Sequence, residues 1–259
     1  MCWLHMQFWT PVNVLDLPAE YYIFMACSVI SDVIYCLGLT RAYRTMEMST
    51  AYPMMRALPL LLTAIITTVL GWGKPLTFMS IAGMAVVFIG CLMMPLSSFR
   101  NFHWSDYINS HLFFIFLVAC GTTGYTVFDS QAQQIMRDAA ANVSKPVLSL
   151  TYYSSRGIVL GTTLLTIVFS IRKEREKFFN FFRNRNFNPV FAGLFATCAY
   201  SLVLIAMNYV SNVSYVQVFR QLGLLVGVAG GILILKERCS APKITGSLCI
   251  VSGLIMTVL

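Results

Sequence analysis

Five ionisable side chains fall inside long apolar segments of the sequence: Asp32, Arg56, Asp129, Arg156 and Arg220. A charge in the hydrocarbon region of a bilayer is costly unless it is paired or hydrated, so these residues are the default candidates for a functional site. Asp32 lies in the middle of the first apolar segment. Its carboxylate could titrate a proton or bind a substrate amine, or it could form an ion pair with an arginine of a neighbouring helix. The sequence leaves both roles open.

Arg56 and Arg220 each lie about two turns into an apolar segment, with Tyr52 one turn before Arg56 and Gln217 just before Arg220. Two arginines that face one cavity would bind an anionic group such as a carboxylate or a phosphate. The alternative is that both snorkel, because two helical turns span only about 9 Å and an arginine side chain can reach the membrane surface from there.

Further polar side chains share helix faces at four- or eight-residue spacing. They form three pairs: Tyr125 with Asp129, Tyr200 with Asn208, and Gln217 with Gln221. Such stripes are typical of a hydrated cavity for a small polar or zwitterionic metabolite. If they instead hold helices together, each interhelical hydrogen bond would contribute about 0.6 kcal/mol. Arg156 is expected to pair with Asp129.

The composition indicates what kind of element must position these residues. Of 259 residues, 58% are apolar and 11% are charged, against about 25% charged residues in a soluble domain. The length allows eight to ten membrane spans of about 20 residues and no separate catalytic domain. The net charge of +8 is therefore interpreted as a record of membrane topology and not as a nucleic-acid-binding surface.

Apolar runs bounded by charged or Pro/Gly-rich breaks predict eight transmembrane helices. They span about residues 21–39, 51–70, 76–96, 111–131, 147–171, 189–209, 213–235 and 242–259. No run shows the alternation of a barrel strand, so an all-α polytopic helical bundle is predicted. The one long connection, residues 172–188, carries six basic and two acidic side chains and is expected to be an amphipathic segment at the membrane surface.

The distribution of Lys and Arg between alternate loops predicts the orientation. If residues 172–188 face the cytoplasm, the loops on that side hold twelve basic residues, and the opposite loops hold three. This count places both ends of the chain on the side opposite the cytoplasm.

The chain also resembles itself when it is shifted by 164 residues, which superimposes residues 42–61 on 206–225. Arg56 then falls on Arg220. After a slip of one residue, two glycines of one segment fall on two of another: Gly83 on Gly246 and Gly90 on Gly253. A matched intramembrane arginine and a recurring glycine pair indicate an internal duplication.

The offset predicts two repeats of five helices, at residues 1–96 and 111–259. The first would lack its first two helices and would begin about 53 residues before Met1. The chain would then be either a truncated form of a ten-helix protein, which we favour, or a natural eight-helix variant. Because each repeat has an odd number of helices, consecutive repeats have opposite orientations in the membrane. With two helices missing from the first repeat, the chain holds eight helices, three in the first repeat and five in the second.

The stretch from Arg220 to Met256 carries the closest resemblance to a known family. Its acidic residue, small polar residue and glycines are Glu237, Ser240, Gly246 and Gly253. The pattern resembles the drug/metabolite transporter superfamily, EamA type, although the corresponding turn of the first repeat, GWGKP at residues 71–75, lacks the acid. The resemblance implies ten helices and a substrate pathway lined by the polar helices. It also implies that both ends lie in the cytoplasm, whereas the count of Lys and Arg places them on the opposite side.

The resulting prediction is a secondary transporter, an EamA-type permease that moves a small polar organic metabolite or drug by alternating access. Asp32 or Asp129 could couple it to protons. The predicted substrate-binding residues are Asp32, Tyr52, Arg56, Tyr125, Asp129, Tyr200, Asn208, Gln217, Arg220 and Gln221. The alternatives are a non-transporting membrane subunit, an inactive truncated form, or, with less support, an integral-membrane enzyme.

No nucleotide-binding P-loop, HExxH motif or metal-ligand spacing of Cys and His occurs, so neither a catalytic residue, a metal nor a cofactor is predicted. The expected partners are a small-molecule solute, the lipid bilayer and protons as a coupling ion, with no nucleic acid. The chain is expected to be a monomer or homodimer, multi-pass in the cell inner or plasma membrane.

Overall fold

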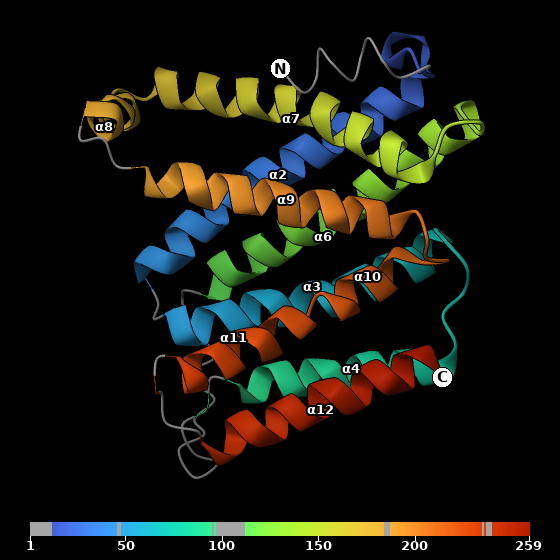
Figure 1. The fold of residues 1–259 in the computed structure, drawn as a ribbon, viewed down its shortest axis with the longest axis vertical. Helices are drawn as coiled ribbons and strands as arrows, with labels where there is room; N and C mark the ends of the chain where they lie inside the picture. The colour runs from blue at the N-terminus through green and yellow to red at the C-terminus, as the bar shows by residue number, and fades with distance from the viewer. Residues whose placement is uncertain are drawn as a thin grey trace. The chain divides into compact units, whose positions relative to one another are not determined.

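The computed structural model describes residues 12–45, 48–94, 96, 112–183, 187–234, 236 and 240–259. Over these residues it is helical and contains no β-strand (Figure 1), as the sequence predicts. The elements are the 3-10 helix η1 (Val14–Asp16) and the α-helices α2 (Ala19–Thr45), α3 (Met48–Leu70), α4 (Phe78–Met93), α6 (Leu112–Ala139), α7 (Lys145–Ser170), α8 (Arg172–Arg183), α9 (Asn188–Met207), α10 (Val213–Phe219), α11 (Leu222–Leu233) and α12 (Ala241–Val258).

Six helices or helix pairs of the described chain are long and apolar enough to cross a membrane. They are α2, α3, α6, α9, α12, and α10 together with α11. A seventh span is obtained if α7 and α8, which are bent by 111° at their junction, are counted as one. The predicted count of eight is therefore not confirmed, because α4 has only 16 residues. At 1.5 Å per residue that is about 24 Å, less than the roughly 30 Å of a hydrocarbon core.

Local sequence signals explain where several helices begin. The Thr77 hydroxyl accepts from the backbone N–H of Ser80 at 3.1 Å and caps α4. Proline in the first turn, where its missing N–H costs nothing, opens three further helices: α7, α9 and α12.

The described chain divides into two compact units. The first takes the described residues up to Val33 together with Phe128–Tyr209, and the second takes Ile34–Val127 together with Val210–Leu259. The boundary falls inside α2 and inside α6, so each of these helices contributes residues to both units.

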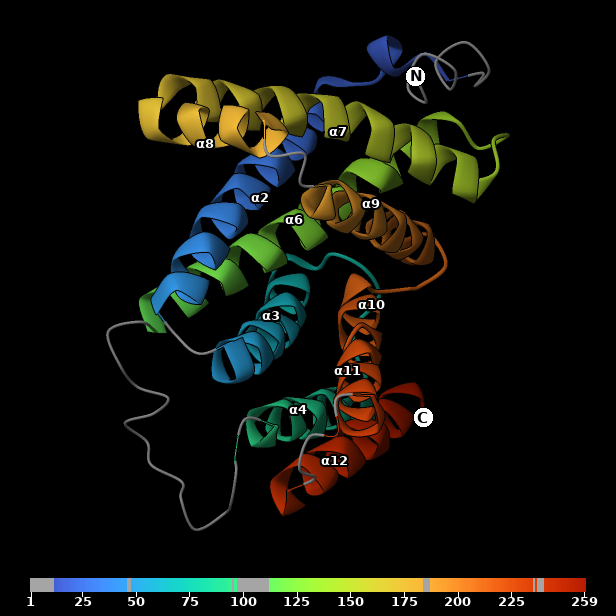
Figure 2. The same ribbon diagram turned by 60° about the vertical axis from the view of Figure 1, so that its left-hand side comes forward.

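In the second unit, α4 and α12 lie side by side in both views (Figures 1 and 2). Glycines permit this approach: a Cβ atom on Gly83 would lie 2.6 Å from the carbonyl oxygen of Gly253, and one on Gly90 would lie 2.8 Å from that of Gly246. The two helices are antiparallel, since the first glycine of one meets the last glycine of the other. Apolar side chains complete this core: Leu60, Met84, Val87, Cys91, Ile250 and Leu254.

The predicted helix over residues 213–235 is interrupted in the structure. Helix α10 ends at Phe219 and α11 begins at Leu222. Across the break the backbone tightens to bonds between residues three apart, with Gln221 N–H donating to the Val218 carbonyl at 3.0 Å and Gly223 N–H to the Arg220 carbonyl at 3.2 Å. Arg220 and Gln221, two of the predicted site residues, therefore sit at the discontinuity.

In the first unit, α7 and α9 pack together, and the Ser149 hydroxyl donates to the Leu204 carbonyl at 3.3 Å. Helix α8 turns back from the end of α7, as Figure 2 shows. The segment predicted to be amphipathic thus begins as a helix at Arg172.

Candidate functional site

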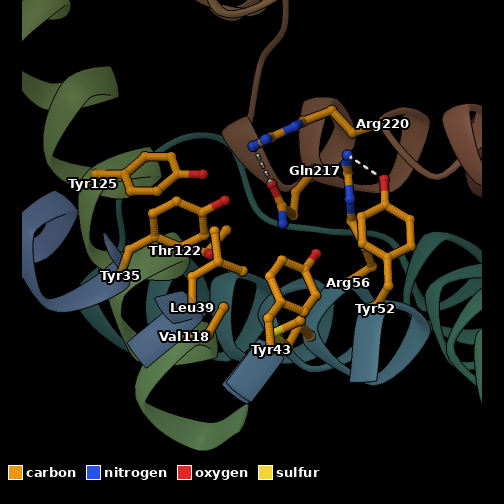
Figure 3. A pocket seen from close by; sticks show the side chains of 11 residues that line it. Tyr35, Leu39, Tyr43, Tyr52, Arg56, Val118, Thr122, Tyr125, Gln217 and Arg220 are labelled. Atoms are coloured by element: carbon orange, nitrogen blue, oxygen red, sulfur yellow. Dashed lines mark hydrogen bonds between the residues drawn. The ribbon is translucent and has the colours of Figure 1, made fainter. Parts of the chain in front are cut away.

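A pocket in the second unit is lined by residues of α2, α3, α6 and α10, including the Arg220 cap of α10 (Figure 3). It encloses about 440 Å³ of empty space, counting the solvent at its open mouth. Its lining residues are Tyr35, Leu39, Tyr43, Tyr52, Met55, Arg56, Val118, Thr122, Tyr125, Gln217 and Arg220. Among these described residues two are cationic and none is acidic, so the side chains that line the pocket carry a net positive charge.

Arg56 is held in this pocket by its own helix. Its Nη2 atom donates to the Tyr52 hydroxyl at 2.9 Å, and its guanidinium carbon lies 5.3 Å from the centroid of the Tyr52 ring. The two residues are four apart on α3 and therefore share a face. A guanidinium has five N–H donors, so one bond to Tyr52 leaves donors for a ligand.

Arg220 enters the pocket from the break between α10 and α11, and its Nη1 atom donates to Gln217 Oε1 at 3.1 Å. Gln221 ties this break to α3: its Nε2 atom donates to the carbonyl of Arg56 at 3.1 Å and to the carbonyl of Gln217 at 3.3 Å. Its Oε1 atom is buried without a hydrogen-bond partner among the described residues. Gln221 thus connects the backbones that carry the two arginines.

Tyrosines form the opposite wall of the pocket. Tyr35, Leu39 and Tyr43 follow one another at four-residue spacing on α2, and Thr122 and Tyr125 share a face of α6. The rings of Tyr35 and Tyr125 pack edge to face, with centroids 5.7 Å apart. The wall therefore combines flat aromatic surfaces with hydroxyl groups.

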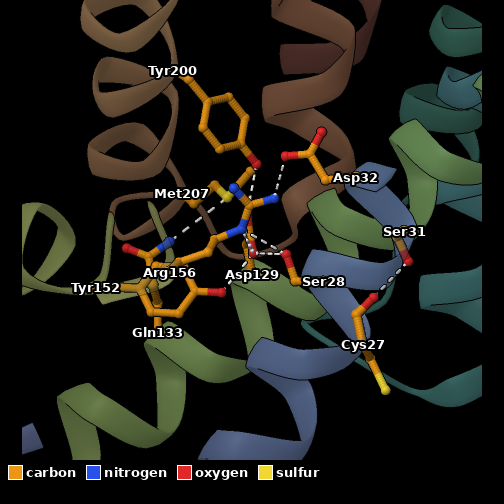
Figure 4. Close-up of polar contacts among 10 residues, drawn as sticks. All are labelled: Cys27, Ser28, Ser31, Asp32, Asp129, Gln133, Tyr152, Arg156, Tyr200 and Met207. Carbon is orange, nitrogen blue, oxygen red and sulfur yellow. Dashed lines mark hydrogen bonds and ion pairs between the residues drawn. The ribbon is translucent and has the colours of Figure 1, made fainter. Parts of the chain in front are cut away.

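A second polar cluster lies in the first unit, around the fully buried Asp129 (Figure 4). The Tyr152 hydroxyl donates to Asp129 Oδ1 at 2.6 Å, and the Tyr200 hydroxyl donates to Oδ2 at 2.5 Å. Ser28 also donates to Oδ1, and Arg156 Nε lies 3.1 Å from it. The predicted pairing of Arg156 with Asp129 is confirmed.

Asp32 shares the same arginine. Arg156 Nη2 lies 2.8 Å from Asp32 Oδ2, and the side chain of Asp32 is 16% exposed, against 2% for Arg156. The ion pair is one of the two roles that the sequence left open for Asp32. Two carboxylates on one guanidinium give the cluster one net negative charge when all three groups are ionised.

Asn208 belongs to another group of the first unit. Its Nδ2 atom donates to Gln133 Oε1 at 2.9 Å and also to Ser149 Oγ, and its Oδ1 atom accepts from Arg137. These bonds join α6, α7 and the C-terminal end of α9. They fit the structural alternative of the sequence analysis, in which such groups hold helices together.

The predicted site residues thus fall into groups. Five of them line the pocket of the second unit: Tyr52, Arg56, Tyr125, Gln217 and Arg220. Gln221 bonds to the backbone carbonyls of two of these, Arg56 and Gln217. Three belong to the cluster of the first unit: Asp32, Asp129 and Tyr200. Sequence reasoning missed several members of both groups: Tyr35, Tyr43, Thr122, Ser28 and Tyr152.

Helical spacing could have identified two of these residues. Ser28 lies four residues before Asp32, and Tyr152 lies four residues before Arg156. Each is therefore on the same helix face as a charge that the sequence had already singled out.

No group of three His, Cys, Asp or Glu side chains in the described part of the chain could hold a metal ion. Glu237, which the sequence analysis considered, lies outside the described residues.

A family model for sugar transport proteins matches residues 12–259. The chain belongs to the sugar transport protein family. The family is part of the drug/metabolite transporter superfamily, so that prediction is confirmed, while the finer EamA-type assignment stays a prediction. No individual curated protein matches the chain. This sugar transport family member is a multi-pass membrane transporter and not an enzyme, and its family implies a small-molecule sugar as substrate.

Proposed function

We propose that the pocket of the second unit is the solute site of the transporter and that its solute is a sugar bearing an anionic group, such as a phosphate or a carboxylate. The observation that carries this proposal is the pair Arg56 and Arg220 in a pocket whose described lining contains no acidic residue. Arginine is suited to this task because its planar guanidinium can donate two parallel hydrogen bonds to one phosphate or carboxylate.

The rest of the pocket suits the sugar itself. A pyranose ring presents C–H faces that pack on aromatic rings and hydroxyl groups that both donate and accept hydrogen bonds. The tyrosine wall offers both kinds of contact, and Thr122 and Gln217 add polar groups that are almost fully buried. A neutral sugar would leave two arginines in the pocket without a counter-charge from the solute.

We further propose that the transporter works by alternating access between two inverted repeats, of the EamA type. Two observations support the duplication. The repeat places Arg56 on Arg220, and both line the same pocket. The repeat also places Gly83 on Gly246 and Gly253 on Gly90. The contact between Gly83 and Gly253 therefore predicts a second contact between Gly246 and Gly90, and the structure contains it. A two-fold axis between equivalent helices requires such reciprocal contacts.

In this arrangement α4 is the eighth span. Leu76 and Thr77 precede the 16 helical residues of α4, and Met94 and Leu96 follow them, so the chain around α4 is longer than the helix itself. Its partner α12 is long and apolar enough to cross a membrane by itself.

Coupling to protons is the proposed motive force, and the cluster of the first unit is its proposed site. Protonation of Asp32, the most exposed member of the ion-paired trio, would remove the net negative charge and release Arg156 to Asp129 alone. Arg156 from α7 bonds to Asp32, and the other titratable groups of the cluster are Asp129 from α6, Tyr152 from α7 and Tyr200 from α9, with Tyr21 of α2 packed on Tyr152. Such an exchange of partners gives the cluster two arrangements that a proton can select.

Uptake into proteoliposomes tests the solute proposal. Labelled glucose 6-phosphate and labelled glucose serve as the anionic and the neutral probe, and protein-free liposomes serve as the control. We expect a higher kcat/KM for uptake of glucose 6-phosphate than for uptake of glucose. Uptake of glucose that exceeds uptake of glucose 6-phosphate and glucuronate would contradict the anionic class, and absence of flux for every sugar would favour a non-transporting subunit.

A further inference from the structure

Helix α8 differs in character from the apolar helices before and after it. It contains five basic and two acidic residues among twelve, and four of the others are phenylalanine. We propose that α8 lies at the membrane surface and binds the headgroups of anionic phospholipids. This interaction is separate from the solute site, which lies in the second unit, and does not depend on it.

The junction with α7 supports a surface position. Helix α7 has 26 residues and ends at Ser170, and Ile171 adopts an extended conformation before the chain turns by 111° into α8. The backbone N–H groups of Glu174 and Arg175 both donate to the Ile171 carbonyl at 3.0 Å, which fixes the first turn of α8 at this corner. If α7 crosses the bilayer along its normal, a helix bent by this angle runs close to the membrane plane.

Aromatic side chains anchor the corner. The Phe169 ring of α7 packs edge to face on Phe178 and Phe179 of α8, with centroids 5.7 and 6.0 Å away. Phe169 and Phe179 nevertheless remain 43% and 56% exposed. Exposed aromatic rings at the end of a span are typical of the interface between headgroups and acyl chains.

The charges of α8 explain why the lipid would be anionic. Arg172 lies 3.3 Å from Glu176, and Lys177 lies 2.6 Å from Glu174, so these four residues neutralise one another. Three exposed cations then have no acidic partner among the described residues: Lys173, Arg175 and Arg183. A net charge of this sign next to a span attracts anionic lipid, and the positive-inside rule places it at the cytoplasmic leaflet.

Fluorescence quenching by brominated lipids tests the proposal on the full chain. Phe179→Trp supplies a reporter on α8, and the emission of the parent protein, which has four Trp, is subtracted. In vesicles of phosphatidylcholine, brominated phosphatidylcholine is expected to quench the reporter more than acrylamide in the water does. In equal mixtures with phosphatidylglycerol, brominated phosphatidylglycerol is expected to quench more strongly than brominated phosphatidylcholine.

Two triple variants separate charge from structure. The neutral one, Lys173→Gln with Arg175→Gln and Arg183→Gln, is expected to lose the preference for phosphatidylglycerol, at about fivefold per charge when the residue lies at the surface. The charge-conserving one, Lys173→Arg with Arg175→Lys and Arg183→Lys, is expected to keep it. All three positions are exposed, so neither variant disturbs the packing of the helices.

Three results would overturn the proposal. They are stronger quenching by acrylamide than by brominated lipid, an equal preference for phosphatidylglycerol in both triple variants, and loss of that preference on adding inorganic phosphate but not chloride of equal ionic strength. The first would place α8 in water, where a soluble partner could bind it, and the last would make free phosphate its ligand.

Discussion

Replacing Arg56 by glutamine removes one of the two guanidinium groups from the pocket and keeps a polar side chain of similar reach. A hydrogen bond to a charged group contributes about 1.5–3 kcal/mol, and about 1.4 kcal/mol corresponds to a factor of ten. Loss of one such bond should therefore raise the KM for an anionic sugar by roughly 10- to 150-fold. A neutral sugar also loses a hydrogen bond to the guanidinium, but it loses no attraction between opposite charges, so its KM should rise by a smaller factor than the KM of the anionic sugar.

The same substitution also breaks the bond from Arg56 to the Tyr52 hydroxyl, at 2.9 Å. Tyr52→Phe is the matched control, because it removes that bond and leaves the guanidinium in place. It should change the KM of anionic and neutral sugars by similar factors. Lys74→Gln, which removes an exposed cation from the turn before α4, controls for the overall charge of the protein.

The assay is uptake of labelled glucose 6-phosphate into proteoliposomes, with glucose as the neutral competitor, for Arg56→Gln, Arg220→Gln and the double variant. If both arginines hold one anionic group, their effects should be coupled by about 0.5–3 kcal/mol in the double-mutant cycle. An unchanged ratio of the two KM values in Arg56→Gln, or strictly additive effects of the two substitutions, would refute the reasoning.

Three further predictions concern other parts of the chain. Asp32→Asn should make uptake insensitive to an imposed pH gradient while the parent responds to it; a parent that ignores the gradient, or a variant that still follows it, would remove Asp32 from coupling. Gly83→Leu should lower the thermal stability in detergent, since overpacking costs about 1–3 kcal/mol, whereas Gly161→Ala, with no atom within 4 Å of its Cβ position, should not; equal melting temperatures would contradict the helix contact. Asp129→Ala should destabilise the protein by about 3–5 kcal/mol by leaving a buried arginine underpaired, and the exposed-pair variant Glu176→Gln by about 1 kcal/mol at most; similar melting temperatures for these two variants would argue against the buried cluster.

Much of the helical architecture follows from the sequence alone, because apolar runs of about 20 residues have few alternatives in a bilayer. The helix ends were less predictable. The apolar pattern alone gave no sign of the break at Arg220 and Gln221, since both Val213–Phe219 and the segment after it are apolar. At the break the Gln221 side chain bonds to the carbonyl of Arg56 on another helix, a contact that one sequence cannot register.

The candidate site was predicted only in part, because contacts between helices cannot be read from one sequence. Charges such as Arg56 and Asp129 are conspicuous in apolar segments, so sequence reasoning found them. Tyr35 and Tyr43 were missed because tyrosine is common in membrane helices and carries no charge. Their place in the pocket is set by the packing of α2 against α6, which a single sequence does not report.

Photoaffinity labelling of the reconstituted protein tests the central claim most directly. An aryl-azide derivative of glucose 6-phosphate is photolysed on the protein, and the labelled peptides are identified by mass spectrometry with and without excess unmodified glucose 6-phosphate. The account predicts competed labels on the tyrosine wall, at Tyr35, Tyr43 and Tyr125, and on the segment of Gln217. Competed labels confined to the first unit, around Tyr152 and Tyr200, would contradict it.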